Sequence, residues 1–281
     1  MFKFALKNMA IKKVKVILIV VSIVISACVA LLAYNISEQV DDGFKSTTAY
    51  YDMIIGPSGS STQLAMNTMF FTEKPLGTFS YEYVEKLQKD NRINKVVPFT
   101  MGDSYNSAKI VGTTPDFLEG KSLAKGEMFA DAFEAVVGSA VAKRYNLKVG
   151  STLVTSHGLS EGGHAHESTP LTVVGILSET TTAYDNVIFT AVQTVWATHG
   201  HGGEEAHEDH EEHEEHGEIC AILVKTKSFN YYNQIKNEIG EDASLLAINP
   251  SEVIREVMQN VDLSAKIVYI LCIIILIMNY L

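Results

Sequence analysis

Val16 to Ile36, VILIVVSIVISACVALLAYNI, holds 21 residues without a charge. As an α-helix this run would rise about 31 Å, close to the hydrocarbon thickness of a bilayer. It is longer than the apolar part of a signal peptide, and no small-x-small cleavage site follows it. The run therefore predicts a retained transmembrane helix over residues 16–36.

The residues before this run indicate how the helix is oriented. Residues 1–15, MFKFALKNMAIKKVK, carry five lysines and no acid. The positive-inside rule then predicts a cytoplasmic N-terminus in the inner or plasma membrane, with residues 37–265 outside the cytoplasm. Residues 1–15 themselves fit either an amphipathic helix on the inner membrane surface or a basic flank without defined structure.

A second apolar run, IVYILCIIILIMNYL, follows Lys266 and reaches the last residue. Its 15 residues would rise only about 22 Å as a helix, which is short of a straight crossing. We therefore expect an incomplete second transmembrane helix over 266–281, and a chain that is a fragment or stops early. A helix pattern over 252–266 leads into this run, with neither Gly nor Pro between Ser251 and Leu281. Such a stiff helix would link movement of the outer domain to movement of the membrane helix.

The segment between the two apolar runs alternates strand and helix patterns, which predicts an α+β domain. Two βαβ-like sets lie far apart in sequence, so we expect an α/β subdomain split into about 45–103 and 217–250. Between them, an inserted β-rich subdomain is expected over about 104–216. The predicted strands are 51–55, 94–99, 109–112, 134–138, 151–155, 171–177, 218–225 and 244–248, and the predicted helices are 80–87, 140–145 and 229–239.

The negative charge of the chain is concentrated in one part of the sequence. The formal net charge of −11 argues against a nucleic acid partner. Nine of the acids fall between positions 204 and 218, so most of the excess belongs to one loop.

All nine histidines lie between positions 157 and 216. Imidazole binds zinc, copper and nickel, and neighbouring carboxylates complete such sites. All of the histidines except His157 are candidate metal ligands, namely His164, His166, His199, His201, His207, His210, His213 and His216.

The spacing of the last four histidines, one every third residue in the His-rich loop 199–218, excludes a catalytic His-Glu-x-x-His zinc motif. Steps of three residues drift around a helix, so several weak sites are expected rather than one closed site. The loop fits three roles: capture of zinc or another transition metal, a solvated acidic segment without function, and a segment that responds to pH. No cofactor is expected to be required.

No pattern in the sequence supports an enzyme. No Ser/His/Asp or Cys/His arrangement stands out, and Gly56 to Ser61, GPSGSS, lacks the Gly-Lys-Ser/Thr ending of a phosphate loop. We expect this segment to form a turn and the chain to have no catalytic site.

Three stretches resemble the MacB/FtsX-like ABC transporter permeases. They are ALKNM at 5–9 before the lysines and the first apolar run, YDMIIGPSGS at 51–60 with Gln63-Leu64 and Met69-Phe70-Phe71, and VGSAVA at 137–142 with NLKVGS at 146–151. The resemblance extends over nearly the whole chain, although its motifs are structural. The His-rich loop is not a general feature of that family.

The resemblance implies a permease with four membrane helices, a MacB-like periplasmic core domain between the first two, a cytoplasmic ATPase partner and a homodimeric, lipid-embedded assembly. Such proteins pass ATP-driven motion to the outer domain, for export or release of a substrate. This sequence departs from that pattern, because it does not contain the third and fourth helices or the cytoplasmic loop that would contact the ATPase. The alternative, drawn from the histidines, is a membrane-anchored metal-binding or metal-sensing protein.

Overall fold

The computed structural model describes residues 12–48, 50–157, 169–200 and 217–280. The chain forms two compact units. The first comprises Met1–Ser46 and Ile254–Leu281, and the second comprises Thr47–Val253.

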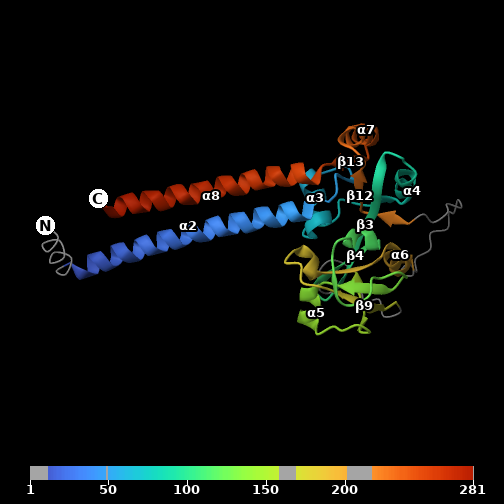
Figure 1. The fold of residues 1–281 in the computed structure, drawn as a ribbon, viewed down its shortest axis with the longest axis horizontal. Helices are drawn as coiled ribbons and strands as arrows, with labels where there is room; N and C mark the ends of the chain where they lie inside the picture. Colours follow the sequence, from blue (N-terminus) through green and yellow to red (C-terminus); the bar gives the residue numbers. More distant parts are fainter. Residues whose placement is uncertain (1–11, 49, 158–168, 201–216, 281) are drawn as a thin grey trace. The chain divides into compact units, whose positions relative to one another are not determined.

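Two long helices make up the described part of the first unit (Figure 1). They are α2 (Lys13–Thr48) and α8 (Pro250–Tyr280). Lys13–Gln39 and Pro250–Ile275 are each long and apolar enough to cross a membrane. Most large apolar side chains of both helices are exposed, for example Leu18 and Ile270, which fits helices surrounded by lipid. The predicted run 16–36 lies within α2, but the helix continues 12 residues further.

The second unit is built on one mixed sheet of eleven strands. Along its main path the strands are β13 (Leu245–Ile248), β1 (Met53–Pro57), β12 (Ala221–Thr226), β3 (Ile93–Tyr105), β4 (Ala108–Thr113), β10 (Val187–Ala191), β6 (Glu134–Val137), β9 (Leu171–Leu177) and β5 (Leu123–Gly126). Two short strands lie off this path, β7 (Thr152–Leu153) on β9 and β8 (Ser156–His157) on β3. A separate pair joins β2 (Phe79–Ser80) to β11 (Glu218–Ile219).

The long strand β3 joins the two halves of this sheet. Its first part, from Ile93 to Phe99, pairs with β12, and its second part, from Thr100 to Tyr105, pairs with β4. A register shift between Met101 and Ser104 interrupts the second ladder, as a β-bulge does where a strand bends. Two separate apolar clusters accompany the halves, one around Ile222 and one around Val173.

Helices pack their apolar faces against the sheet, as α7 shows. Helix α7 (Phe229–Ile239) is capped by Ser228, buries Tyr232, Ile235 and Ile239, and contacts β12 and β13. The remaining helices are α3 (Ser61–Phe70), α4 (Glu82–Gln88), α5 (Ser139–Tyr145) and α6 (Val192–Gly200), with 3₁₀ turns η1 (Pro115–Leu118) and η2 (Ala183–Asn186).

Five aromatic rings from five separate segments pack together inside the second unit. Phe71, Phe99, Phe117, Tyr184 and Phe189 have ring centroids 5.4–6.3 Å apart. These separations are those of favourable edge-to-face and offset contacts. Burial raises the pKa of the Tyr184 hydroxyl, so this ring stays neutral.

The predicted α+β fold, with an N-terminal apolar helix and a second candidate apolar helix near the C-terminus, is confirmed. One local prediction was wrong: Gly56 and Pro57 belong to β1, and Ser60 caps α3, so the segment 56–61 is only partly a turn. Two helices, α3 and α6, were not predicted. The predicted boundaries of the split and inserted subdomains stay a prediction.

Candidate functional site

The strands that continue into the two apolar helices are neighbours. The chain passes from α2 into β1, and from β13 into α8. β1 and β13 pair antiparallel, with Ile54 opposite Ile248 and Pro57 opposite Leu245. The start of β1 and the end of β13 therefore lie at the same end of the sheet. The chain segments that lead to the two apolar helices therefore start from the same end of the sheet of the second unit, and we call this end the helix junction.

The two strands of the helix junction differ in how firmly they are held. β1 pairs on its other side with β12, where Ile54 lies opposite Leu223, and its Met53, Ile54 and Ile55 are fully buried. Burying one such side chain contributes about 2 kcal/mol to stability. Among the described strands, β13 stands at the end of the strand order and pairs with β1 alone, although Ser58 also donates to the Leu245 backbone oxygen at 3.2 Å and α7 contacts the strand.

Charged side chains hold Tyr50, the first described residue after α2, in place. Tyr50 donates a hydrogen bond from its hydroxyl to Glu119, and Lys95 forms an ion pair with the same carboxylate. Lys225 donates to the backbone oxygen of Tyr50 at 2.8 Å, and its ammonium lies 4.8 Å from the centre of the Tyr50 ring. Although burial opposes its charge, the bonds to Glu119 and Tyr50 raise the pKa of Lys95. The chain leaving α2 is thus tied to β12, β3 and η1.

Two further side chains order the helix junction. The Asp52 carboxylate accepts hydrogen bonds from the backbone N–H of Thr226 at 2.8 Å and from its hydroxyl at 3.1 Å. Asn249 accepts from the backbone N–H of Glu252 at 3.1 Å, which is the bond of a helix cap, and Pro250 follows as the first residue of α8. Asp52, Thr226 and Asn249 also line a cavity of about 250 Å³.

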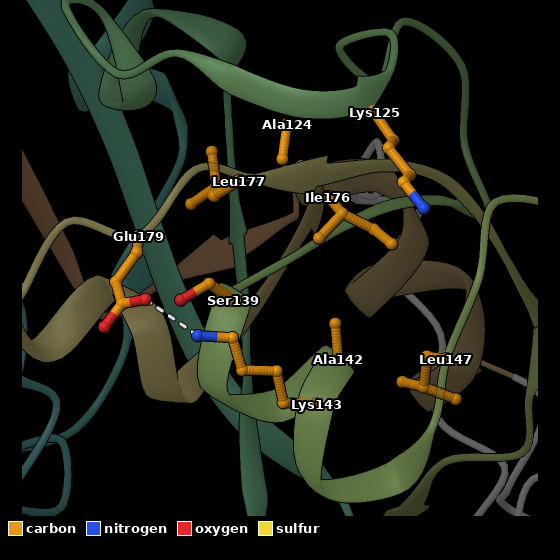
Figure 2. A pocket seen from close by; sticks show the side chains of 9 residues that line it. All are labelled: Ala124, Lys125, Ser139, Ala142, Lys143, Leu147, Ile176, Leu177 and Glu179. Carbon is orange, nitrogen blue, oxygen red and sulfur yellow. Dashed lines mark hydrogen bonds and ion pairs between the residues drawn. The ribbon is translucent and has the colours of Figure 1, made fainter.

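A second cavity, of about 370 Å³, lies between α5, β9 and β5 (Figure 2). We call it the α5 cavity. Both α5 and β5 supply apolar and polar side chains to its lining, and the Lys143 ammonium forms an ion pair with Glu179 at 2.7 Å. That carboxylate raises the pKa of Lys143. The residues that line the cavity are Ala124, Lys125, Ser139, Ala142, Lys143, Leu147, Ile176, Leu177 and Glu179.

The predicted metal ligands fall almost entirely outside the described residues. His199 lies in α6, whereas the other seven are outside the described residues: His164, His166, His201, His207, His210, His213 and His216. Across 12–48, 50–157, 169–200 and 217–280, no three His, Cys, Asp or Glu residues are grouped to hold a metal. The metal site stays a prediction.

The structure does bring together the points from which the two His-bearing segments start. The backbone of His157 pairs with Asp103 in the ladder between β8 and β3. The Thr198 hydroxyl, one residue before His199, donates to the Asp103 carboxylate at 3.2 Å. The described residues His157 and Thr198 thus both lie at Asp103, whose carboxylate is buried.

Sequence reasoning did not find the helix junction. The sequence did contain its two strands, because a predicted strand (51–55) follows the first apolar helix and another (244–248) precedes the second apolar helix. Pairing between strands almost 200 residues apart, however, depends on the whole fold rather than on either pattern.

Comparisons with known proteins address the family. Residues 16–242 match the model of the MacB-like periplasmic core domain. Similar solved structures include the periplasmic region of MacB from Actinobacillus actinomycetemcomitans, at TM-score 0.49 and 15% identity over 77% of this chain and 96% of that chain. They also include the extracellular domain of the noncanonic ABC-type transporter YknZ from Gram-positive bacteria, at TM-score 0.42 and 12% identity over 70% of this chain and 99% of that chain. No curated protein matches the chain. The family match over most of the sequence shows that this chain belongs to the MacB-like periplasmic core domain family of ABC transporter permeases.

Proposed function

We propose that this chain transmits ATP-driven motion from a cytoplasmic ATPase partner to its extracytoplasmic domain, for export or release of a substrate. The observation that carries the proposal is the helix junction, where neighbouring strands of one sheet continue into the two apolar helices. A displacement of either helix therefore acts first on the β1–β13 ladder. The proposed role includes no catalytic step in this chain.

The family and the N-terminal apolar helix indicate a membrane protein with an extracytoplasmic domain. For the orientation we rely on the lysines near the N-terminus, among them Lys12, Lys13 and Lys15, which favour the cytoplasmic side. The second unit would then stand outside the cytoplasm, and the two helices would be in contact with lipid.

Both helices continue beyond their apolar parts. From Ile36 to Thr48, α2 rises about 18 Å, and from Pro250 to Lys266, α8 rises about 24 Å. These parts mix charged residues, among them Glu38 and Glu256, with apolar ones such as Met258. We infer that they form stalks between the bilayer and the second unit.

The two stalks differ in stiffness. Gly43 lies within the stalk of α2, and a glycine inside a helix costs about 1 kcal/mol relative to alanine. α8 has neither Gly nor Pro after Pro250, and it follows β13, which pairs with a single strand among those described. α8 is therefore the better transmitter, while α2 is attached to the firmly held β1.

The test begins with the full-length protein. Purified from its own host membranes, it should retain a cytoplasmic ATPase, and it should be a homodimer by light scattering. ATP hydrolysis by the complex in lipid nanodiscs should exceed that of the ATPase alone. If no ATPase co-purifies and added candidate ATPases show no change in rate, the proposal is overturned.

Metal capture is a second candidate function. It is favoured by the histidine content of 157–216 and by the contacts of His157 and Thr198 with Asp103. Zinc titration of the full chain in nanodiscs should show several bound ions, and deletion of 158–168 or of 201–216 should each lower that number. Equal zinc binding by the intact chain and the double deletion would eliminate this candidate.

A further inference from the structure

We propose that the α5 cavity binds a small aliphatic carboxylate, with its hydrocarbon part against the apolar wall and its carboxylate on Lys125. The inference rests on the cavity itself and does not depend on the proposed motion. A volume of about 370 Å³ falls in the range of small-molecule sites.

The apolar wall of the cavity comes from three directions. Ile176 and Leu177 extend from β9, Ala142 from α5, and Leu147 from the segment after that helix. Ala124 also lines the cavity, from β5, the strand at the end of the order (Figure 2). Such a wall favours an aliphatic group, because each methylene removed from water gains about 0.8 kcal/mol.

One hydroxyl in the lining lacks a protein partner. Ser139, the first residue of α5, is 6% exposed, and within the described chain its Oγ makes no hydrogen bond. A buried polar group left without a partner costs about 1–3 kcal/mol. A second oxygen on the ligand, or an ordered water, would satisfy this hydroxyl.

The charges around the cavity select an anion. Glu179 neutralises Lys143 through their ion pair, while Lys125 has no ion-pair partner among the described residues. Figure 2 shows the Lys125 side chain extending toward Ile176, the centre of the apolar wall. One uncompensated cation beside an apolar surface is complementary to a carboxylate that carries a hydrocarbon group.

Two sources share this chemistry: a free fatty acid and the C-terminal residue of an apolar peptide. The experiment follows the Ile176 methyl signal by NMR in the full chain in nanodiscs, with Ile235 of α7 as an internal reference. The probes are N-acetyl-leucine, hexanoate, and N-acetyl-leucinamide, which lacks the carboxylate. Saturable shifts of the Ile176 signal are expected with either carboxylate. Tighter binding of hexanoate identifies a fatty acid as the source, and tighter binding of N-acetyl-leucine identifies a peptide C-terminus.

Variants decide whether the carboxylate binds as proposed. Lys125→Gln should weaken binding at least fivefold, whereas Lys148→Gln, an exposed lysine outside the lining, should leave it unchanged. Ala124→Phe, at an exposed position, should fill the cavity and abolish the shifts without unfolding the chain. The proposal is overturned if the amide binds as tightly as the acid, if Lys125→Gln has no effect, or if no probe binds up to 10 mM (about 3 kcal/mol).

Discussion

Gly138 shows how tightly the start of α5 is packed. A Cβ at this position would overlap the backbone oxygens of Tyr184 and Asp185 in η2. Because backbone cannot move aside as a flexible side chain can, we predict that Gly138→Ala lowers the free energy of unfolding by about 1–3 kcal/mol. Urea unfolding of the detergent-purified chain measures the change.

Gly240 provides the control for that substitution. It ends α7 with φ −66°, and a Cβ there would come no closer than 3.3 Å to its neighbours. Gly240→Ala should therefore change stability by no more than about 0.5 kcal/mol. Equal losses in the two variants would mean that the contact with η2 is not the cause.

Asp242 makes stability depend on pH. Ser244 donates to its carboxylate from both N–H and hydroxyl, at 2.9 and 2.6 Å, and Tyr83 donates at 2.6 Å. These bonds, those from Ser244 first, lower the pKa of Asp242 to about 2. The ionised carboxylate thus stabilises the fold above its unfolded pKa of about 3.9, and this contribution is lost as the pH falls toward about 2.

The matching variant is Asp242→Asn. Its deficit in stability relative to the native chain should be full at pH 7 and should shrink as the pH falls from about 4 to about 2. Urea midpoints over this pH series measure it. A deficit that stays constant across the series would show that the charge of Asp242 is not responsible.

At the scale of elements, the cap of α8 sets the order of its first turn. Asn249→Ala removes the acceptor for the Glu252 N–H, at a cost of about 1 kcal/mol, whereas Asn249→Asp keeps it. Hydrogen exchange over residues 250–254 should accelerate in the alanine variant and remain near native in the aspartate variant. Unchanged exchange in both variants would contradict the role of the cap.

The sequence predicts elements well where local signals agree. α7 was predicted over 229–239, with the observed bounds, and the structure shows agreeing local signals there, since Ser228 caps the helix and its buried residues repeat with helical spacing. β9 was also predicted with its observed bounds.

Elements whose stability depends on the rest of the fold were missed. α6, VQTVWATHG, is rich in β-branched residues that disfavour isolated helices. Its buried Thr194 is satisfied by the Phe133 N–H and the Thr190 hydroxyl, partners that the local sequence does not reveal. The end of α2 was missed for another reason, since hydropathy marks the apolar run and not the polar helix beyond it.

At the scale of the whole molecule, strand order lay beyond the sequence. The predicted strands could pair in many ways, and the observed order combines antiparallel pairs with the parallel pairs β10–β4 and β6–β9. The cavity beside α5 likewise depends on the packing of β5, β9 and α5 together. The candidate metal ligands, by contrast, could be named from sequence alone, but almost all of them lie outside the described residues.

The central claim is that ATP-driven motion reaches the second unit through the stiff stalk of α8. Proline inside a helix removes a hydrogen bond and kinks it, at a cost of about 3 kcal/mol, so Val261→Pro should interrupt transmission while Val261→Ala should not. Both variants should still assemble with the ATPase.

The most direct measurement is the distance between spin labels placed by Lys148→Cys on the two protomers of the full-length complex, with Cys28, Cys220 and Cys272 replaced by alanine. Pulsed electron paramagnetic resonance should show that ATP changes the distance distribution in the chain with the native stalk and in Val261→Ala. In Val261→Pro the distribution should be the same with and without ATP. If ATP leaves the distribution unchanged in the native stalk, or if Val261→Pro responds as the native stalk does, transmission through α8 is contradicted.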